Sequence, residues 1–192
     1  MIALRVSSDL ERMAKALEAQ QGKVRRAIAQ GLNEGGDKVR TQVRAAMRQQ
    51  TGLVRLSSVT SRERNVRAFA TGFEAKSGVG PPRPGGLSYT IVYTGKPTKP
   101  KEFRWKATTG PGGGVTVWMW NVYHKFQRSF LGAGKIAGLL KMRKIGPRLP
   151  TRSFDGPNLA KEAVKGDVAH TFLVGAGTIV PPIIEKRLAR AL

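Results

Sequence analysis

The first part of the chain carries apolar residues at the spacing of an α-helix. Residues 8–20 open with Ser8, followed three positions later by Glu11, which is a capping-box pattern for a helix start. Residues 23–49 show one apolar stripe at steps of four or seven, made of Val24, Ile28, Leu32, Val39, Val43 and Met47. The pattern predicts two amphipathic helices, the second of which ends near Gly52.

Glycines interrupt the interior of the second predicted helix. Gly31, Gly35 and Gly36 stand where glycine costs about 1 kcal/mol relative to alanine. Either the close approach of another helix or a kink at Gly35-Gly36 would account for them. Together with Ala27, Gly31 and Gly35 form a ridge without side-chain bulk. Packing of this ridge within the subunit is the preferred interpretation, and packing between subunits is the alternative.

After residue 52 the pattern changes to the alternation of β-strands. Four segments predict strands: 64–75, 87–94, 103–107 and 115–123. They favour a meander of about four strands. Segments rich in Gly and Pro separate or follow them, at 78–86 (GVGPPRPGG), 96–101 (KPTKPK) and 145–158 (IGPRLPTRSFDGPN). Because these residues disfavour regular structure, the first is interpreted as a loop or an arm and the second as an extended basic connector, which a ring could use as arms toward neighbouring subunits.

The last third of the chain returns to helical spacing. Residues 158–172 predict a helix after Pro157, and residues 181–191 predict another with prolines in its first turn, where they are tolerated. Residues 135–145 are too short and too basic to assign.

These elements predict an α+β fold. Long N-terminal helices would pack on a roughly four-stranded, mostly antiparallel sheet, with C-terminal helices and extended Pro/Gly-rich arms. A length of 192 residues suits a single domain with a hydrophobic core. Its expected parts are helical over 8–50, β-rich over 64–123, and loop and helical over 124–192.

The charge is large and unevenly placed. The 34 Lys and Arg residues against 12 Asp and Glu give a net charge of +22, which favours a polyanion or an acidic partner. From Phe103 to Phe154 there is no acidic residue. The basic residues of that span are Arg104, Lys106, Lys125, Arg128, Lys135, Lys141, Arg143, Lys144, Arg148 and Arg152. They predict a cationic surface that contacts the DNA backbone; a solvated or partner-neutralised surface is the alternative.

The tryptophans accompany this basic span. Trp105, Trp118 and Trp120 could stack on bases, but burial in the sheet is the preferred interpretation at strand positions. No helix-turn-helix, zinc-finger or RNA-recognition signature is present, so sequence-specific recognition is not expected.

The sequence offers little for catalysis. It has no cysteine, and neither His124 nor His170 has neighbouring ligands for a metal, so a surface or capping role is expected for both. Asp155 is an isolated acid in a turn-forming DGP, whereas metal-dependent nucleases use several carboxylates. The glycine run at 110–114 lacks the Lys-Ser/Thr ending of a phosphate-binding loop. We expect no enzyme activity, no cofactor and no metal site.

Membrane association is not expected either. The N-terminal residues lack the apolar run of about 7–15 residues of a secretory signal. The longest apolar stretch, 171–184, contains Pro181 and Pro182 and is shorter than the roughly 20 residues that span a bilayer. We expect a soluble protein made in the cytoplasm.

Four segments in a fixed order carry a further signal. They are the helix at 23–53 ending in TGL, the strand and proline connector at 86–106, the strand VTVWMWNVYHKFQRSFLG at 115–132, and RLPTRSFDGPNLAKEA at 148–163. Their order resembles the minor tail protein Z and tail-completion family of long-tailed (siphovirus-type) bacteriophages. The matching motif residues are Leu149, Pro150, Gly156, Pro157, Lys161 and Glu162. Thr151 stands where the family pattern has an aliphatic residue.

The resemblance implies a structural virion protein that completes the head-proximal end of the tail and helps form the head-tail joint around the DNA channel. It implies partners among neck and tail proteins, such as the tail terminator and the head-tail connector, and a homo-oligomer, by analogy a sixfold ring. Packaged DNA is a further expected contact, and the virion, assembled in the host cytoplasm, is the expected location. The alternative is a non-specific nucleic-acid-binding protein of ribosomal or nucleoid type.

Overall fold

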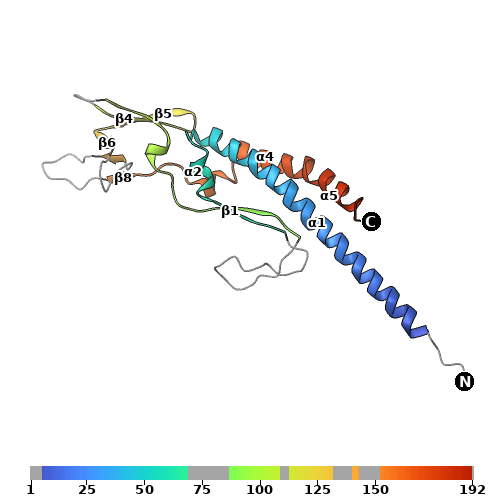
Figure 1. Cartoon of the computed structure of the whole chain (residues 1–192). Helices are drawn as coiled ribbons and strands as arrows, with labels where there is room; N and C mark the ends of the chain where they lie inside the picture. Colours follow the sequence, from blue (N-terminus) through green and yellow to red (C-terminus); the bar gives the residue numbers. More distant parts are fainter. Residues whose placement is uncertain (1–5, 69–86, 109–112, 132–139, 143–151, 192) are drawn as a thin grey trace, which may run out of the picture. The chain divides into compact units, whose positions relative to one another are not determined.

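The computed structural model of the chain describes residues 6–68, 87–108, 113–131, 140–142 and 152–191. Side chains are described for 20–68, 87–108, 113–131 and 154–191. The fold is α+β, as predicted, with a long N-terminal helix, antiparallel sheets and C-terminal helices (Figure 1).

The chain divides into two compact units. The first contains Met1–Val39, Asn65–Thr90 and Val174–Leu192, and the second contains Arg40–Arg64 and Ile91–Leu173. Each is described below by its own contacts. The assignment of 1–192 to a single tail-completion domain stays a prediction.

Helix α1, Val6–Thr51, is one continuous helix where the sequence predicted two. Gly22 lies between the two predicted helices, and its helical penalty of about 1 kcal/mol is too small to break a helix with well-bonded turns on both sides. Val39, Val43 and Met47 of the predicted stripe are buried. The helix ends as predicted at Gly52, which has a φ of +79° and donates its N–H to Arg48 O at 3.0 Å.

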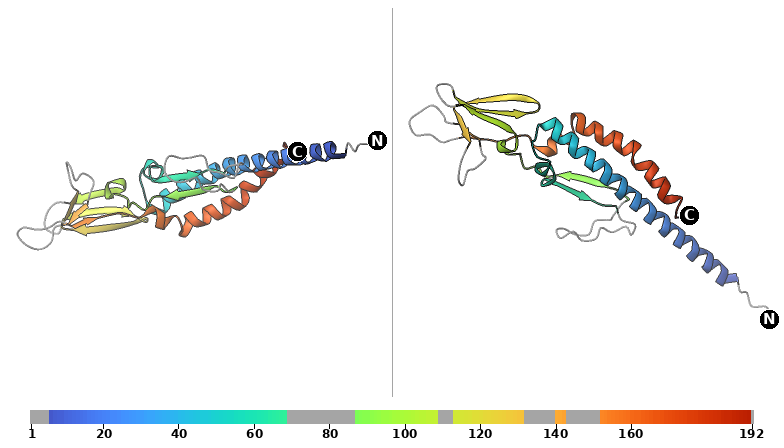
Figure 2. Two further views of the ribbon diagram at one scale, coloured as in Figure 1. Left: turned by 90° about the horizontal axis from the view of Figure 1, so that it is seen from below. Right: turned by 45° about the horizontal axis from the view of Figure 1, so that its top comes forward.

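The small-residue ridge of α1 packs against helix α5, Val180–Leu188, which runs beside α1 in Figures 1 and 2. A Cβ atom on Gly31 would lie 2.9 Å from Ile184 Cα, and one on Gly35 would lie 3.1 Å from Val180 Cα. The glycines are therefore explained by the close approach of another helix of the same chain, which is the packing within the subunit that the sequence favoured. The Tyr89 ring covers Gly36.

The C-terminal helices follow the prediction in type. The predicted helix at 158–172 is divided into α3, Leu159–Glu162, and α4, Gly166–Thr178. Asn158 caps α3 by accepting the Ala160 N–H at 3.0 Å. Gly166 has a φ of +53°, which separates the two helices.

The stretch Gly166–Leu188 is long and apolar enough to cross a membrane by length and composition alone, with 23 residues and a mean hydropathy of 1.3. The sequence predicted that Pro181 and Pro182 would cut this stretch short. They do not, because they occupy the first turn of α5, where proline is tolerated. A single helix of this kind is weak support for a membrane span.

The strands form three small sheets, which differs from the predicted single meander. Strands β1 (Glu63–Val66) and β2 (Thr90–Tyr93) pair in one sheet. The second sheet has the order β3-β4-β5, with bounds Arg104–Thr108, Gly114–Met119 and Val122–Gln127. The third has the order β6-β7-β8, with bounds Ser129–Leu131, Leu140–Met142 and Arg152–Phe154.

A turn that the sequence did not reveal adds a strand to the second sheet. Trp120 and Asn121 have φ values of 49° and 59°, so the chain reverses inside the predicted strand 115–123 and starts β5. Two positive φ values at the centre of a hairpin match the right-handed twist of the strands. Trp120-Asn121 lacks the glycine that usually marks such a turn, so the prediction from alternation alone continued the strand through it.

The connector at 96–101, predicted as an extended connector that could serve as an arm, is anchored in the second unit instead. Thr98 is fully buried, and its N–H and hydroxyl donate to Pro157 O at 3.0 and 2.9 Å. Gly156 N–H donates to Thr98 O at 2.7 Å, and a Cβ atom on Gly156 would lie 2.9 Å from Phe103 Cε2. The buried connector continues into a short 3₁₀ helix, η1, Pro100–Glu102. The predicted arm at 78–86 lies outside the described residues.

The core of the second unit combines residues from α1, the sheet and the C-terminal helices. Helix α2, Ser57–Thr60, contributes Val59. The largest fully buried apolar side chains of this unit are Phe103, Met47, Leu159, Val59, Val115, Val117 and Val168. An isolated β-bridge joins Leu53 to Phe103, so the residues that follow α1 are fixed near the start of β3.

Candidate nucleic-acid interface

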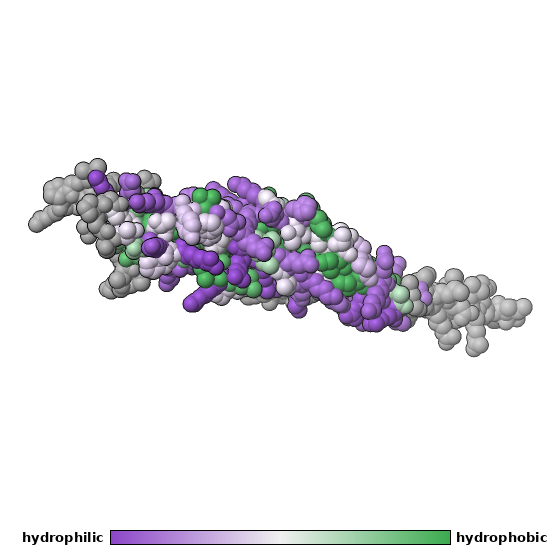
Figure 3. Space-filling view, turned by 90° about the horizontal axis from the view of Figure 1, so that it is seen from above, coloured by the Kyte–Doolittle hydropathy of each residue, from purple (hydrophilic) through white to green (hydrophobic). Residues whose placement is uncertain are grey.

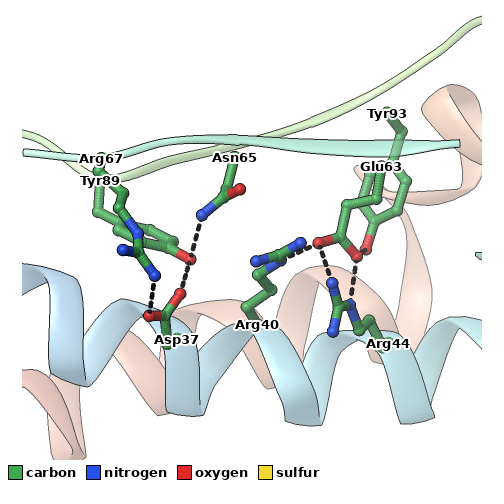
Figure 4. A network of polar contacts seen from close by, with 8 residues as sticks. All are labelled: Asp37, Arg40, Arg44, Glu63, Asn65, Arg67, Tyr89 and Tyr93. Carbon is green, nitrogen blue, oxygen red and sulfur yellow. Dashed lines mark hydrogen bonds and ion pairs between the residues drawn. The ribbon is translucent and has the colours of Figure 1, made fainter. Parts of the chain in front are cut away.

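Several described carboxylates neutralise arginines inside the fold. Glu63 has a fully buried side chain and binds both Arg40 and Arg44 (Figure 4). Arg44 donates from Nε and Nη2 to the two Glu63 carboxylate oxygens, at 2.8 and 3.0 Å. The Tyr93 hydroxyl donates to the same carboxylate at 3.4 Å. Burial raises the pKa of Tyr93 above its usual value, and the nearby Glu63 charge adds to the rise, so the hydroxyl stays protonated.

A second group in Figure 4 lies within the first unit. Asp37 accepts hydrogen bonds from Arg67 Nη2 at 2.9 Å and from the Tyr89 hydroxyl at 2.6 Å. Asn65 Nδ2 donates to the Tyr89 hydroxyl at 3.3 Å. The hydroxyl therefore accepts from one neighbour and donates to the other.

Glu102 and Glu34 are paired in the same way. Burial raises the pKa of Glu102, but the two Arg62 nitrogens at 2.7 and 2.8 Å and the Lys99 N–H outweigh that effect and lower it overall. The hydrogen bond from Arg187 at 2.8 Å lowers the pKa of Glu34. These acids serve the fold and leave other cations without a counter-charge.

The β3-β4-β5 sheet places three cations that make no ion pair among the described residues on one face. Residues that alternate along a strand share a face, and cross-strand partners lie side by side. The registers β3·β4 and β4·β5 place two rows on one face, Lys106–Thr116–Lys125 and Arg104–Trp118–Tyr123. We call these six residues the cationic sheet face.

The opposite face of the same sheet packs into the core. Val115, Val117 and Met119 are at most 5% exposed, so the cationic sheet face is the solvent side. Its basic residues, Arg104, Lys106 and Lys125, are all exposed. Within the part of the chain that the structure describes, none of the three makes an ion pair or a side-chain hydrogen bond. Among the described residues on the side that Figure 3 shows, hydrophilic residues are interrupted by smaller apolar patches.

Two aromatic rings lie among these cations. The Trp118 and Tyr123 rings meet edge to face, with centroids 4.3 Å apart. Tyr123 is 68% exposed. Basic groups interleaved with exposed aromatic rings on an antiparallel sheet can bind phosphates and stack on bases.

A pocket of about 490 Å³ adjoins the cationic sheet face within the second unit. Its lining residues are Ala45, Arg48, Gln49, Gly52, Leu53, Val54, Leu56, Arg104, Trp118 and Asn121. They include two guanidinium groups and no carboxylate. Arg48 comes from the last turn of α1, outside the basic span at 103–154 that predicted the cationic surface.

A shallower depression of about 600 Å³ lies in the connector region of the second unit. Three exposed lysines line it, Lys96, Lys99 and Lys101. Ser57, Ser58 and Ser61 are also among its lining residues. Its remaining cation, Arg62, is occupied by Glu102. This surface offers additional phosphate contacts, but it has no aromatic lining.

The predicted basic residues are brought together only in part. Arg104, Lys106 and Lys125 share the cationic sheet face, whereas Arg128 is exposed beyond the end of β5. Lys141 and Arg152 lie on β7 and β8, where side chains are not described. Outside the described residues are Lys135, Arg143, Lys144, Arg148, Leu149 and Pro150.

The described motif residues have structural positions. Gly156 and Pro157 hold the connector through Thr98. Lys161 is exposed on α3, and Glu162 accepts a hydrogen bond from Gln50 Nε2 at 3.1 Å.

The preferred interpretation of the tryptophans as buried was wrong for Trp105 and Trp120. Trp105 and Trp120 are 49% and 42% exposed, and Trp118 is half-buried. Trp105 lies on edge strand β3, and Trp120 occupies the turn, so neither is covered on both sides.

The histidines differ from each other. His170 is exposed, in agreement with the surface role expected for it. His124 is not exposed: its Nε2 atom is buried and has no hydrogen-bond partner among the described residues, and its ring meets Trp120 edge to face with centroids 5.9 Å apart. No group of three or more potential metal ligands is found among the described residues. The absence of enzyme activity stays a prediction.

Comparisons with models of protein families, with curated proteins and with solved structures found no match for this chain. Any functional interpretation therefore depends on the motifs of the sequence and on the geometry of the cationic sheet face.

Proposed function

We propose that this chain is a structural protein of a phage neck or tail, and that its cationic sheet face contacts the phosphate backbone of DNA. The observation that carries the DNA contact is the exposed row of unpaired cations on a sheet whose other face is core. The order of the four sequence segments, and their resemblance to tail-completion proteins, supports the neck or tail location.

The spacing of the cations favours contact with a polymer. Lys106 and Lys125 occupy strands on either side of β4, so their backbones are about 10 Å apart. That separation suits two different phosphates better than one. Contacts from Lys and Arg to phosphates carry no sequence information, so the binding is expected to be independent of sequence.

The test is a matched pair of triple variants. Arg104→Gln/Lys106→Gln/Lys125→Gln removes the cationic sheet face. Lys23→Gln/Arg25→Gln/Arg26→Gln removes the same charge from exposed positions on α1. Duplex-DNA affinity is measured over a range of salt concentrations. The first variant should flatten the slope of log affinity against log salt by about 2–3, because each lost phosphate contact reduces it by about 0.9. The second should leave the slope nearly unchanged. Equal slopes for the two variants would overturn the proposed DNA contact.

The neck or tail location has its own test. A ring component around a DNA channel should remain oligomeric at high salt and should be recovered in purified particles. A free protein of ribosomal or nucleoid type, which the cationic sheet face would also suit, should be monomeric at high salt and absent from particles. Light scattering in about 1 M salt and protein analysis of purified particles separate the two. The proposed partners, among them the tail terminator and head-tail connector, would be identified by cross-linking in the particle.

A further inference from the structure

The pocket beside the cationic sheet face has the lining of a nucleotide site. Its volume of about 490 Å³ falls within the range of about 300–1,000 Å³ that is typical of small-ligand sites. Arg48 and Arg104 supply charge, and Leu53, Val54 and the Trp118 ring supply apolar surface. A phosphate with an attached planar base carries both complementary features.

Trp118 is held in place before any ligand arrives. A Cβ atom on Gly52 would lie 3.3 Å from Trp118 Cδ1, so the indole packs closely over this glycine. The edge-to-face contact with the Tyr123 ring further restricts the indole. Within the described residues the indole N–H donates no hydrogen bond, and it remains available to a ligand. A fixed aromatic ring loses little conformational entropy when a base stacks on it.

The end of α1 near the pocket weakens the attraction for an anion but does not cancel it. A helix C-terminus carries roughly half a negative charge. Three carbonyls of its last turn are already occupied: Arg48 O and Thr51 O accept the N–H groups of Gly52 and Trp120, both at 3.0 Å. Asn121 Nδ2 binds Gln49 O at 3.3 Å. The two guanidinium groups therefore dominate the charge of the pocket.

A stacked duplex cannot fill such a site. The faces of its bases are covered by neighbouring base pairs, whereas single-stranded nucleic acid exposes them to aromatic side chains. We propose that this pocket binds one unpaired nucleotide of single-stranded DNA, with the base on Trp118 and a phosphate between Arg48 and Arg104. The Lys106 and Lys125 row would hold the neighbouring backbone. This inference rests on the proposed function, because it adds a preference for single strands to the same surface.

The experiment begins with a variant in which Trp118 is the sole tryptophan, Trp105→Phe/Trp120→Phe. Titration with an oligothymidylate should quench its fluorescence saturably, whereas a blunt duplex of equal length should not. In the otherwise native protein, Trp118→Leu should weaken oligothymidylate binding roughly tenfold and duplex binding less than twofold, because the duplex is held through Arg104, Lys106 and Lys125. Trp105→Leu is the matched control, since Trp105 lies on the opposite face of the same sheet, and it should change neither.

A second variant covers the case in which Trp118→Leu does not fold. Arg48 is exposed on α1, and Arg48→Gln should weaken oligothymidylate binding several-fold while duplex affinity changes less than twofold. Lack of quenching, or equal weakening of single-strand and duplex binding in either variant, would overturn the inference. The proposed function fails separately, if the cationic-face triple variant keeps the salt dependence of duplex binding.

Discussion

Two basic regions of the second unit differ in whether their positive charges are paired with a carboxylate. Around Glu63, two arginines that are about one-fifth exposed surround a carboxylate that is fully buried. On the cationic sheet face, Arg104, Lys106 and Lys125 are exposed and have no described carboxylate beside them. Burying a charge is tolerated only when it is paired, so the first region needs its acid to fold. The second region needs none to fold, and its charge is free to act on a ligand.

The largest expected effect comes from removing the acid of the first region. Glu63→Ala removes the buried carboxylate that binds Arg40 and Arg44, and breaking a buried pair in this way costs about 3–5 kcal/mol of unfolding free energy. Urea denaturation measures the change. Glu185→Gln, at an exposed carboxylate, is the control and should stay within about 0.5 kcal/mol. A small effect at Glu63 would mean that the two regions do not differ as described.

The next effect is a pH dependence at a second paired acid of this unit, Glu102, which binds Arg62; the cationic sheet face contains no carboxylate and should show none. The folded protein lowers the pKa of Glu102 from its usual value of 4.5, so the folded state binds fewer protons there than the unfolded state. Its contribution is complete above the unfolded pKa and is lost as the pH falls through the folded value. Glu102→Gln should therefore cost about 1.5–3 kcal/mol near pH 7 and much less below pH 4.5. Denaturation curves from pH 7 down to pH 3 test this; an equal cost at both ends would contradict it.

The sequence predicted the two regions to different extents. Arg104 and Lys106 stand two positions apart in a predicted strand, and this spacing already favours one shared face. The pairing of Glu63 with Arg40 and Arg44 could not be predicted, because it depends on how β1 packs on α1. Arg48 joins Arg104 in one pocket only because Trp120 and Asn121 bind the last carbonyls of α1. Such contacts are tertiary and leave no periodic signal in the chain.

Supplying the missing acid should make the second region resemble the first. Thr116 lies between Lys106 and Lys125 in the cross-strand row. Thr116→Glu would pair with both lysines and compete with phosphate, so duplex-DNA affinity should fall roughly tenfold and the salt slope should flatten by about 2. Stability should change by less than about 1 kcal/mol, since exposed ion pairs contribute little. Thr116→Gln is the uncharged control, and a similar loss of affinity in it would show that the effect is steric.

The smallest effect concerns a polar atom that the sheet leaves unsatisfied. The Glu63 carboxylate is bound by three neighbours, whereas His124 Nε2 is buried with no hydrogen-bond partner in the described residues. His124→Phe removes this polar atom and keeps an aromatic ring against Trp120, so the unfolding free energy should rise by up to about 1 kcal/mol. Tyr123→Phe, on the exposed face, should change it by less than about 0.5 kcal/mol. If His124→Phe is destabilising, the ring nitrogen has a partner in solution, and the contrast between a fully bonded region and an incompletely bonded sheet is lost.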